Sequence, residues 1–406
     1  MGPLSTTAFV IIGAVKVIVI FTLWLLAVAG VTLAERKVAA WIQDRSGPNR
    51  VGPWGVLQPI ADGLKNFVKE ETRPADSSRL LFMLAPMMSM FPAFVVFAVI
   101  PIAAPLTTPW GTVNIIIADL PVGFLFILAL ASLGVYGLVL GGWASNSKYP
   151  FLGGVRASAQ MISYEVALGL SLVPILMLSG NVSLPEIVSQ QQETLWFVLP
   201  LMVGYLFFTV AYFAETNRPP FDMPEAESEL VYGFHTEYSA MKFAIFMMAE
   251  YSNMIVASAL MATFFFGGWD IPFWVGDNMR VAAGGVVVGA APAWWITLLT
   301  AASFALKTGF FVLLFIWVRW TIPRFRYDQV MSLGWKVMIP ALIAYIVVLG
   351  VAMLLLEASG VQVDTTYMLW LTGLNLIGVL VIIFWLDRKR VIVGSGWKQF
   401  RPQETR

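Results

Sequence analysis

The chain of 406 residues contains no cysteine and a single histidine, His235. Because cysteine thiolates hold iron–sulfur clusters, the chain cannot ligate such a cluster on its own. Zinc and protein-bound haem also take cysteine or histidine ligands, so the composition argues against both kinds of site. We therefore expect no metal site and no cofactor bound by this chain. If the protein takes part in redox chemistry, the electron carriers are expected on partner chains or on small lipophilic molecules.

Charged side chains are also scarce: they make up 12% of the residues, against 59% that are hydrophobic, and the mean hydropathy is +0.79. No phosphate-binding glycine motif follows a predicted strand, because the glycines at 284–289 lack both its spacing and its setting. Apolar runs of about twenty residues recur instead, each long enough to cross roughly 30 Å of hydrocarbon as a helix. The sequence predicts an all-α, polytopic helix bundle that forms one integral membrane domain over residues 1–406.

Nine membrane spans are predicted, and the first lacks the charged start and cleavage site of a signal peptide, so we expect it to be retained. The spans lie at 10–34, 80–103, 121–142, 158–179, 195–215, 240–266, 296–319, 336–356 and 366–386. Alternate loops and the C-terminal tail hold 22 of the 25 lysines and arginines, whereas the other loops hold only Arg280. By the positive-inside rule, the N-terminus is expected outside the cell membrane and the C-terminus in the cytoplasm.

The segment 54–70 is too short and too polar to cross a membrane. Its apolar residues recur at helical spacing, with polar residues on the opposite face. We expect an amphipathic helix that lies in the membrane interface, with Pro59 confined to its first turn.

The acids that this charge-poor chain does contain are concentrated between two apolar segments. Five of them fall within 15 residues: Glu215, Asp222, Glu225, Glu227 and Glu229. One alternative is structural, with Asp222 capping a helix that begins at Pro224 and Glu225 in its first turn, but this accounts for only two of the five. Prolines at 219, 220 and 224 also prevent a regular helix there. Crowded carboxylates raise one another's pKa, which suits a proton relay.

Ionisable residues inside predicted spans are costly and usually functional, and three further ones are candidates here. Glu165 is expected roughly 10 Å deep in the fourth span, because each helical residue rises about 1.5 Å. Arg156 is too far along the helix to pair with it. Glu250 and Lys307 lie near the middle of the sixth and seventh spans. Each could be a pore residue, or the two could form one buried ion pair.

Four segments together resemble a known family. They are 35–37 with 47–52 and 57–62; 142–149 through 163–165; 215–229 with 235–239; and 323–329. In this order they are similar to the signatures of the H-subunit family of bacterial proton-pumping NADH:quinone oxidoreductase, respiratory complex I, and the resemblance covers about residues 10–356. The ninth span and basic tail, 357–406, and the long stretch 267–295 depart from the family pattern. We expect both to serve packing or contacts with neighbouring subunits.

The resemblance implies roles for particular residues. It implies a quinone chamber where this subunit meets the peripheral arm, and a path of acids that couples quinone reduction to proton translocation. The implied chamber residues are Glu35, Arg36, Asp62, Lys65 and Phe221. The implied path residues are Glu165, Glu215, Glu225, Glu227, Glu229 and Glu250. The inner-loop residues expected to contact partners are Arg45, Arg50, Asp222, Arg324, Arg326 and Asp328.

The resemblance also implies partners. Quinone would be the substrate, while FMN, NADH and iron–sulfur clusters would bind to other subunits of complex I. Those partners would include the peripheral-arm quinone-site subunits and small membrane-arm subunits, together with membrane lipids but no nucleic acid. Two alternatives are a secondary cation/proton antiporter and the equivalent subunit of a membrane-bound hydrogenase. The sequence shows no inverted pair of broken helices, which many such transporters have.

Overall fold

The computed structural model describes residues 6–108, 111–224, 227–272, 274, 277, 280–282, 286–288, 293–361 and 363–388. Eight helical stretches in this part of the chain are long and apolar enough to cross a membrane, so the predicted polytopic helix bundle is confirmed. The long helices are α1 (Thr6–Ile42), α3 (Arg79–Phe97), α4 (Gly123–Ala144), α5 (Lys148–Ser179), α9 (Ala240–Phe265), α10 (Trp294–Thr321), α12 (Ile339–Ala358) and α13 (Thr365–Arg388).

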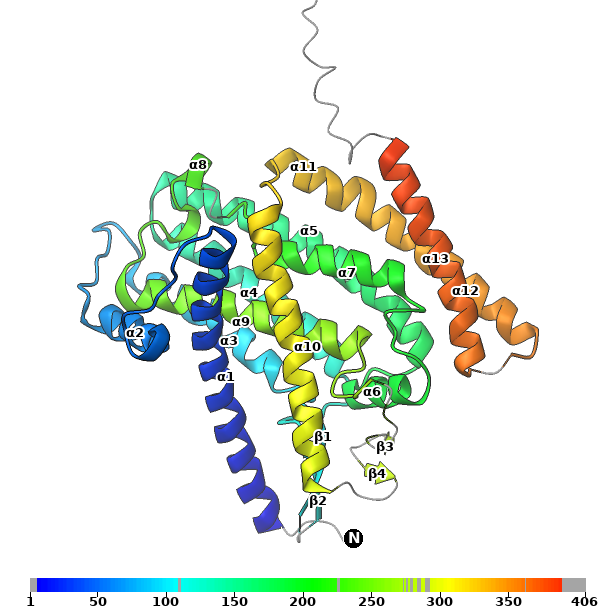
Figure 1. The fold of residues 1–406 in the computed structure, drawn as a ribbon. Coiled ribbons are helices and arrows are strands. Elements are labelled where there is room, and N and C mark those ends of the chain that lie inside the picture. The colour runs from blue at the N-terminus through cyan, green and yellow to red at the C-terminus, as the bar shows by residue number, and fades with distance from the viewer. Residues whose placement is uncertain are drawn as a thin grey trace, which may run out of the picture.

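The short elements lie at opposite ends of the bundle (Figure 1). Near one end are α8 (Glu227–Leu230) and α11 (Tyr327–Ser332), and at the other are α6 (Leu184–Glu193) and two antiparallel hairpins. The hairpins pair β1 (Ala103–Thr108) with β2 (Gly111–Ile115) and β3 (Arg280–Ala282) with β4 (Val286–Val288). The two loops that contain α8 and α11, both predicted to be basic, thus lie at the same end. The sequence predicted only loops where α6 and the hairpins lie.

Several helix boundaries differ from those predicted. Helix α1 continues to Ile42, so Glu35 and Arg36 lie inside a helix rather than at its end. Helix α5 begins at Lys148, ten residues earlier than expected, because Pro150 falls in its first turn, where a missing N–H is tolerated. Glu165 therefore lies near the middle of α5.

The fifth predicted span is much shorter as a helix than expected. Helix α7 covers only Met202–Glu215, whereas the prediction was 195–215. Fourteen residues rise about 21 Å, less than the roughly 30 Å of hydrocarbon. Residues 194–201 are not helical, and 197–201, which include Pro200, form turns. The other end is as predicted: α7 stops at Glu215, before the proline-rich loop.

The predicted amphipathic helix is present and shorter. Helix α2 covers Gln58–Val68, preceded by the 3-10 turn η1 (Pro53–Gly55), and Pro59 lies in its first turn as expected. Its apolar side chains remain exposed, with Leu64 at 62% and Phe67 at 71%. A helix with one exposed apolar face suits the membrane interface.

The packed core lies where α5, α7 and α9 meet. Tyr164, Phe208 and Leu260 are fully buried there. Between membrane helices such contacts act through van der Waals packing and hydrogen bonds, because lipid is as apolar as the core. A hydrogen bond joins α5 to α11: the Tyr164 hydroxyl donates to the carbonyl of Val330 at 2.9 Å. Val330 lies just before a π-helical segment, η3 (Leu333–Met338), which leads into α12.

Candidate functional site: a charged cleft and an acidic cavity

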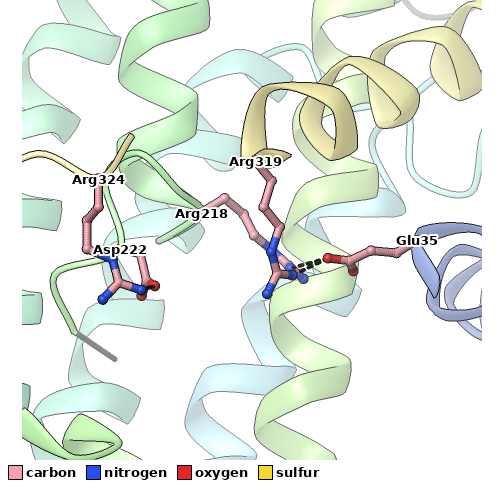
Figure 2. Close-up of polar contacts among 5 residues, drawn as sticks. All are labelled: Glu35, Arg218, Asp222, Arg319 and Arg324. Carbon is pink, nitrogen blue, oxygen red and sulfur yellow. Dashed lines mark hydrogen bonds and ion pairs between the residues drawn. The ribbon is translucent and has the colours of Figure 1, made fainter. Parts of the chain in front are cut away.

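A buried carboxylate on α1 lies at the centre of a cluster of charges. Glu35 is 6% exposed, and its carboxylate accepts hydrogen bonds from Arg218 at 3.3 Å and from Arg319. Figure 2 shows the two guanidinium groups converging on Glu35 from the loop after α7 and from the end of α10. Tyr251 of α9 lies beside Glu35, and the Arg218 guanidinium lies 4.6 Å from the centre of the Tyr251 ring. Glu35 thus ties together α1, α9, α10 and the loop after α7.

This cluster forms one wall of a cleft of about 360 Å³. The cleft is lined by Glu35, Arg36, Ala39, Arg45, Pro48, Tyr251, Arg319 and Trp320. The backbone of Gly55 packs closely against the Pro48 carbonyl: a Cβ on residue 55 would lie 2.1 Å from the Pro48 carbonyl oxygen. The charged lining favours a ligand that is polar or becomes anionic.

The next residue of α1 connects the cleft to α2. The Arg36 guanidinium donates to the Asp62 carboxylate at 2.6 Å, and Lys65 lies 3.5 Å from the same carboxylate. Partial burial opposes ionisation of Asp62, but Arg36 and Lys65 outweigh it and hold the pKa of this carboxyl below its usual value. The structure therefore brings four of the five predicted chamber residues together.

Phe221, the fifth, lies elsewhere. It is 4% exposed, and its ring packs 5.5 Å from Tyr164 and 5.4 Å from Phe325, measured between ring centres. The buried amide of Gln160 donates to the carbonyls of Ala214 and Phe221, each at 2.7 Å. Gln160 thereby fixes the loop that follows Glu215 against α5. Phe221 is therefore packed among aromatic side chains and is not among the residues that line this cleft.

The predicted partner-contact residues have several environments. Asp222 is 4% exposed and accepts a hydrogen bond from Arg324 at 2.6 Å (Figure 2). Arg326 and Asp328 lie 3.6 Å apart on the surface. Arg45 donates to Gln43 at 2.7 Å, and Arg50 is exposed. The described part of the acidic loop resumes in helix at Glu227, so a cap from Asp222 to a helix beginning at Pro224 is not what the structure shows.

Replacing Arg324 by glutamine is expected to reduce the amount of assembled protein. Removing one partner of a buried ion pair leaves the other charge uncompensated, and we expect about 3 kcal/mol, the lower end of the usual range, because Arg324 is partly exposed. The measurement is the amount of folded protein extracted from membranes. Pairing the change with Asp222→Asn should recover part of the loss, whereas equal loss in the single and double variants would contradict the ion-pair explanation.

Two predicted path residues share an enclosed cavity of about 60 Å³. Glu215, at the end of α7, and Glu250, in α9, both line it, and Ser89, Tyr212 and Asn253 add further polar groups. A cavity holds a water molecule once it offers about 10–15 Å³ to the probe and has polar partners. This cavity is therefore large enough for several waters, and the two carboxyl groups offer them polar partners at its wall.

The other path residues do not line this cavity, and their surroundings differ. Glu165 accepts a hydrogen bond from the Ser132 hydroxyl, and its carboxylate is near enough to Glu215 for the two to repel. Glu229 pairs instead with Arg156 at 2.7 Å, near the surface. Glu227 begins α8, and Glu225 lies outside the described residues.

Lys307 has partners at the far end of the bundle. Its ammonium donates to the carbonyls of Phe266, Gly268 and Asp270, at 2.7, 3.1 and 2.5 Å, just beyond the C-terminus of α9. It also lies 4.3 Å from the centre of the Trp196 ring. A cation is favourable where helix carbonyls lack intrahelical partners. The buried ion pair with Glu250, one of the two alternatives, is therefore not formed.

Sequence reasoning missed Arg218, Arg319, Tyr251 and Gln160 as parts of the site. Arg218 and Arg319 were counted only as basic loop residues. The signal that could have found Arg319 is its place beside the buried face of α10, one helical turn from Phe315 and Ile316. Nothing in the local sequence of Gln160 indicates that it binds a loop more than fifty residues away. Among the described residues, no group of three or more histidine, cysteine, aspartate or glutamate side chains could hold a metal ion.

Comparison with known proteins gives a consistent family. A family model described as NADH dehydrogenase matches residues 15–350, a match that ends before α13. A protein of Cytophaga hutchinsonii, named as an H subunit of NADH-quinone oxidoreductase, is 45% identical over 349 residues, 86% of this chain and 98% of that protein. Proteins of Leptospira biflexa and Geobacter metallireducens, also named as H subunits of this enzyme, are 48% and 49% identical, each over 82% of this chain and over 92% and 94% of their own lengths.

Proposed function

The chain belongs to the NADH dehydrogenase family, as a membrane subunit of NADH-quinone oxidoreductase, and from this premise we propose that it forms one wall of a quinone chamber and couples quinone reduction to proton translocation. It is one subunit of an oxidoreductase complex, and its long apolar helices make it a multi-pass membrane protein. The observation that carries the proposal is the nearness of two features: the charged cleft around Glu35 and the acidic cavity of Glu215.

The cleft supports the quinone part of the proposal. Arg36 and Arg319 line it beside Glu35, and α2 with its exposed apolar face is attached to the same wall through Asp62. An apolar quinone tail suits the α2 surface, and a headgroup that gains negative charge on reduction suits the guanidinium groups. Quinone is thus the proposed substrate, while the electron carriers FMN, NADH and iron–sulfur clusters belong to partner subunits.

One short segment connects the cleft to the cavity and supports the coupling part. Arg218 bonds to Glu35 in the cleft, and only three residues earlier in the chain Glu215 lines the cavity with Glu250. A change of charge in the cleft therefore acts on the Arg218 guanidinium. Arg218 lies in the loop that directly follows Glu215, and Gln160 holds this loop in place. Glu165 would extend the path along α5, with Glu225, Glu227 and Glu229 at its cytoplasmic side.

The proposed orientation of the chain in the membrane follows from the distribution of its lysines and arginines. The N-terminus would lie outside the cell membrane and the C-terminus inside, so that the acidic loop and cleft face the cytoplasmic peripheral arm. Arg45, Arg50, Arg326 and Asp328 are exposed on that side and would contact its subunits.

The identity of the partner subunits separates this proposal from its alternatives. Mass spectrometry of the gently solubilised complex should find NADH-oxidising subunits. A nickel–iron subunit would indicate the hydrogenase instead. Recovery of this chain alone, active in cation exchange, would indicate the antiporter. The names of the curated relatives support the first outcome.

The variant Leu64→Glu tests the entrance of the chamber. Leu64 is exposed on the apolar face of α2, and burying a carboxylate in the interface there would displace the helix. Quinone reductase activity is expected to fall about tenfold, equivalent to about 1.4 kcal/mol. NADH oxidation with an artificial acceptor should be unchanged.

The matched control is Asn66→Glu, which adds the same charge to the polar side of α2 and should leave quinone reduction near its normal rate. Equal loss of quinone reduction and artificial-acceptor activity in Leu64→Glu would indicate failed assembly. Normal quinone reduction in Leu64→Glu would contradict the assignment of α2 to the entrance.

A further inference from the structure

Helix α13 carries one buried polar side chain whose hydrogen-bonding capacity is completely used. Asn375 is 1% exposed. Its amide nitrogen donates to the carbonyls of Pro200 at 2.5 Å and Leu371 at 3.1 Å. Its amide oxygen accepts from the Val203 N–H at 3.3 Å and from the Tyr345 hydroxyl at 2.8 Å. An asparagine amide offers two donors and one oxygen with two lone pairs, and all four are occupied here.

Two of these bonds complete the broken start of α7. Leu201 is at the N-cap position of α7 and has no side chain able to cap it. Val203 is the second helical residue, whose N–H a serine or aspartate at the N-cap would normally bind. Asn375 supplies that acceptor from another helix and also binds the carbonyl of Pro200. In hydrocarbon these backbone groups have no water to bind, so a partner is required.

The two helices also approach closely at this point. A Cβ added to Gly378 would lie 3.0 Å from a methyl carbon of Val203. Small residues allow membrane helices to pack at short distance. Tyr345 brings α12 into the same contact, so α7, α12 and α13 meet at the Asn375 amide. In Figure 1, α13 lies beside α12 at one side of the bundle.

We propose that Asn375 is a positioning residue that caps α7 from α13 and thereby sets the position of Glu215. The inference rests on the proposed function for its last step, since Glu215 is the acid at the opposite end of the same helix. Twelve residues separate Val203 from Glu215, a rise of about 18 Å along one unbroken helix. A loosened start of α7 therefore allows the whole short helix to shift against the cavity. The ninth span, which lies beyond the residues that match the family, acquires a defined role.

The test uses the intact complex with Asn375→Leu, which keeps the size of the side chain and removes its hydrogen bonds. Amide hydrogen exchange in peptides covering 198–206 should become about tenfold faster. Protons pumped per electron should fall by about half, and the pH profile of quinone reduction should shift, because the surroundings of Glu215 change. The matched control is Thr372→Val, since the Thr372 hydroxyl donates to the carbonyl of Met368 in its own helix at 2.7 Å. It should leave all three measurements unchanged.

Unchanged exchange at 198–206 in Asn375→Leu would overturn the cap. Faster exchange with normal pumping and a normal pH profile would overturn the positioning role. If Asn375→Leu does not assemble, Gly378→Ala provides the same test, because its methyl group pushes α13 away from Val203; about threefold faster exchange supports the cap, and no change overturns it. Failure of the proposed function is distinguishable, because then Glu215→Gln would itself leave pumping unchanged while the exchange effect persisted.

Discussion

Replacing Glu215 by glutamine is expected to remove most proton-coupled quinone reduction while the complex still assembles. Glutamine keeps the shape of the side chain but cannot release a proton. At an effective dielectric near 20, a unit charge 4 Å away is worth about 4 kcal/mol, or roughly three pKa units, and at 10 Å about 1.7 kcal/mol. Reduction of quinone can therefore reset nearby carboxyl groups. We expect about a tenfold loss of pumping in membranes, the effect of one pKa unit of lost coupling.

Glu165→Gln should give a similar loss, because its carboxylate interacts with that of Glu215 from α5. The matched control is Glu70→Gln, which removes an exposed carboxylate at the start of the loop after α2 and should be silent. The measurements are quinone reductase rate and proton uptake in sealed vesicles. If Glu215→Gln and Glu165→Gln both pump normally, the acids are structural and the relay is wrong.

The sequence predicted the arrangement of the helices better than their ends. Apolar length located every long helix, and the lysine and arginine distribution grouped loops that the structure places at one end, near α8 and α11. The ends were less accurate because capping and tertiary contacts set them. Pro150 was taken as part of a loop, although a first turn tolerates it. The start of α7 depends on Asn375, far away in sequence, which no local pattern reveals.

The acidic residues of the candidate site were predictable from the sequence, and its basic residues were much less so. Acids are rare in this chain, so a group of them near an apolar segment is conspicuous, and Glu215 and Glu250 do share a cavity. Arginines in inner loops are expected in any membrane protein. Nothing in a count of lysines and arginines indicates that Arg218 and Arg319 converge on Glu35, because these two arginines lie 183 and 284 positions away from Glu35 in the sequence.

The variant Glu35→Gln should strongly reduce quinone reduction by disturbing the charge balance of the cleft. Glu35 lies between Arg218 and Arg319, and without its negative charge the two guanidinium groups remain close together, that of Arg218 being buried. An uncompensated buried charge costs about 3 kcal/mol or more. Arg319 and Arg218 would move apart and take the cleft wall with them. We expect about a tenfold or greater loss of quinone reductase activity, since 1.4 kcal/mol corresponds to tenfold.

The control for this variant restores the balance instead of removing more charge. In Glu35→Gln with Arg319→Gln, one negative and one positive group are lost together, so Arg218 no longer faces a second guanidinium, and part of the activity should return. Glu35→Asp keeps the charge and should lose less than Glu35→Gln. NADH oxidation with an artificial acceptor should remain normal in all three variants, because that reaction does not use the cleft. If the double variant is no better than Glu35→Gln, the carboxylate acts on the quinone directly and not through its arginine partners.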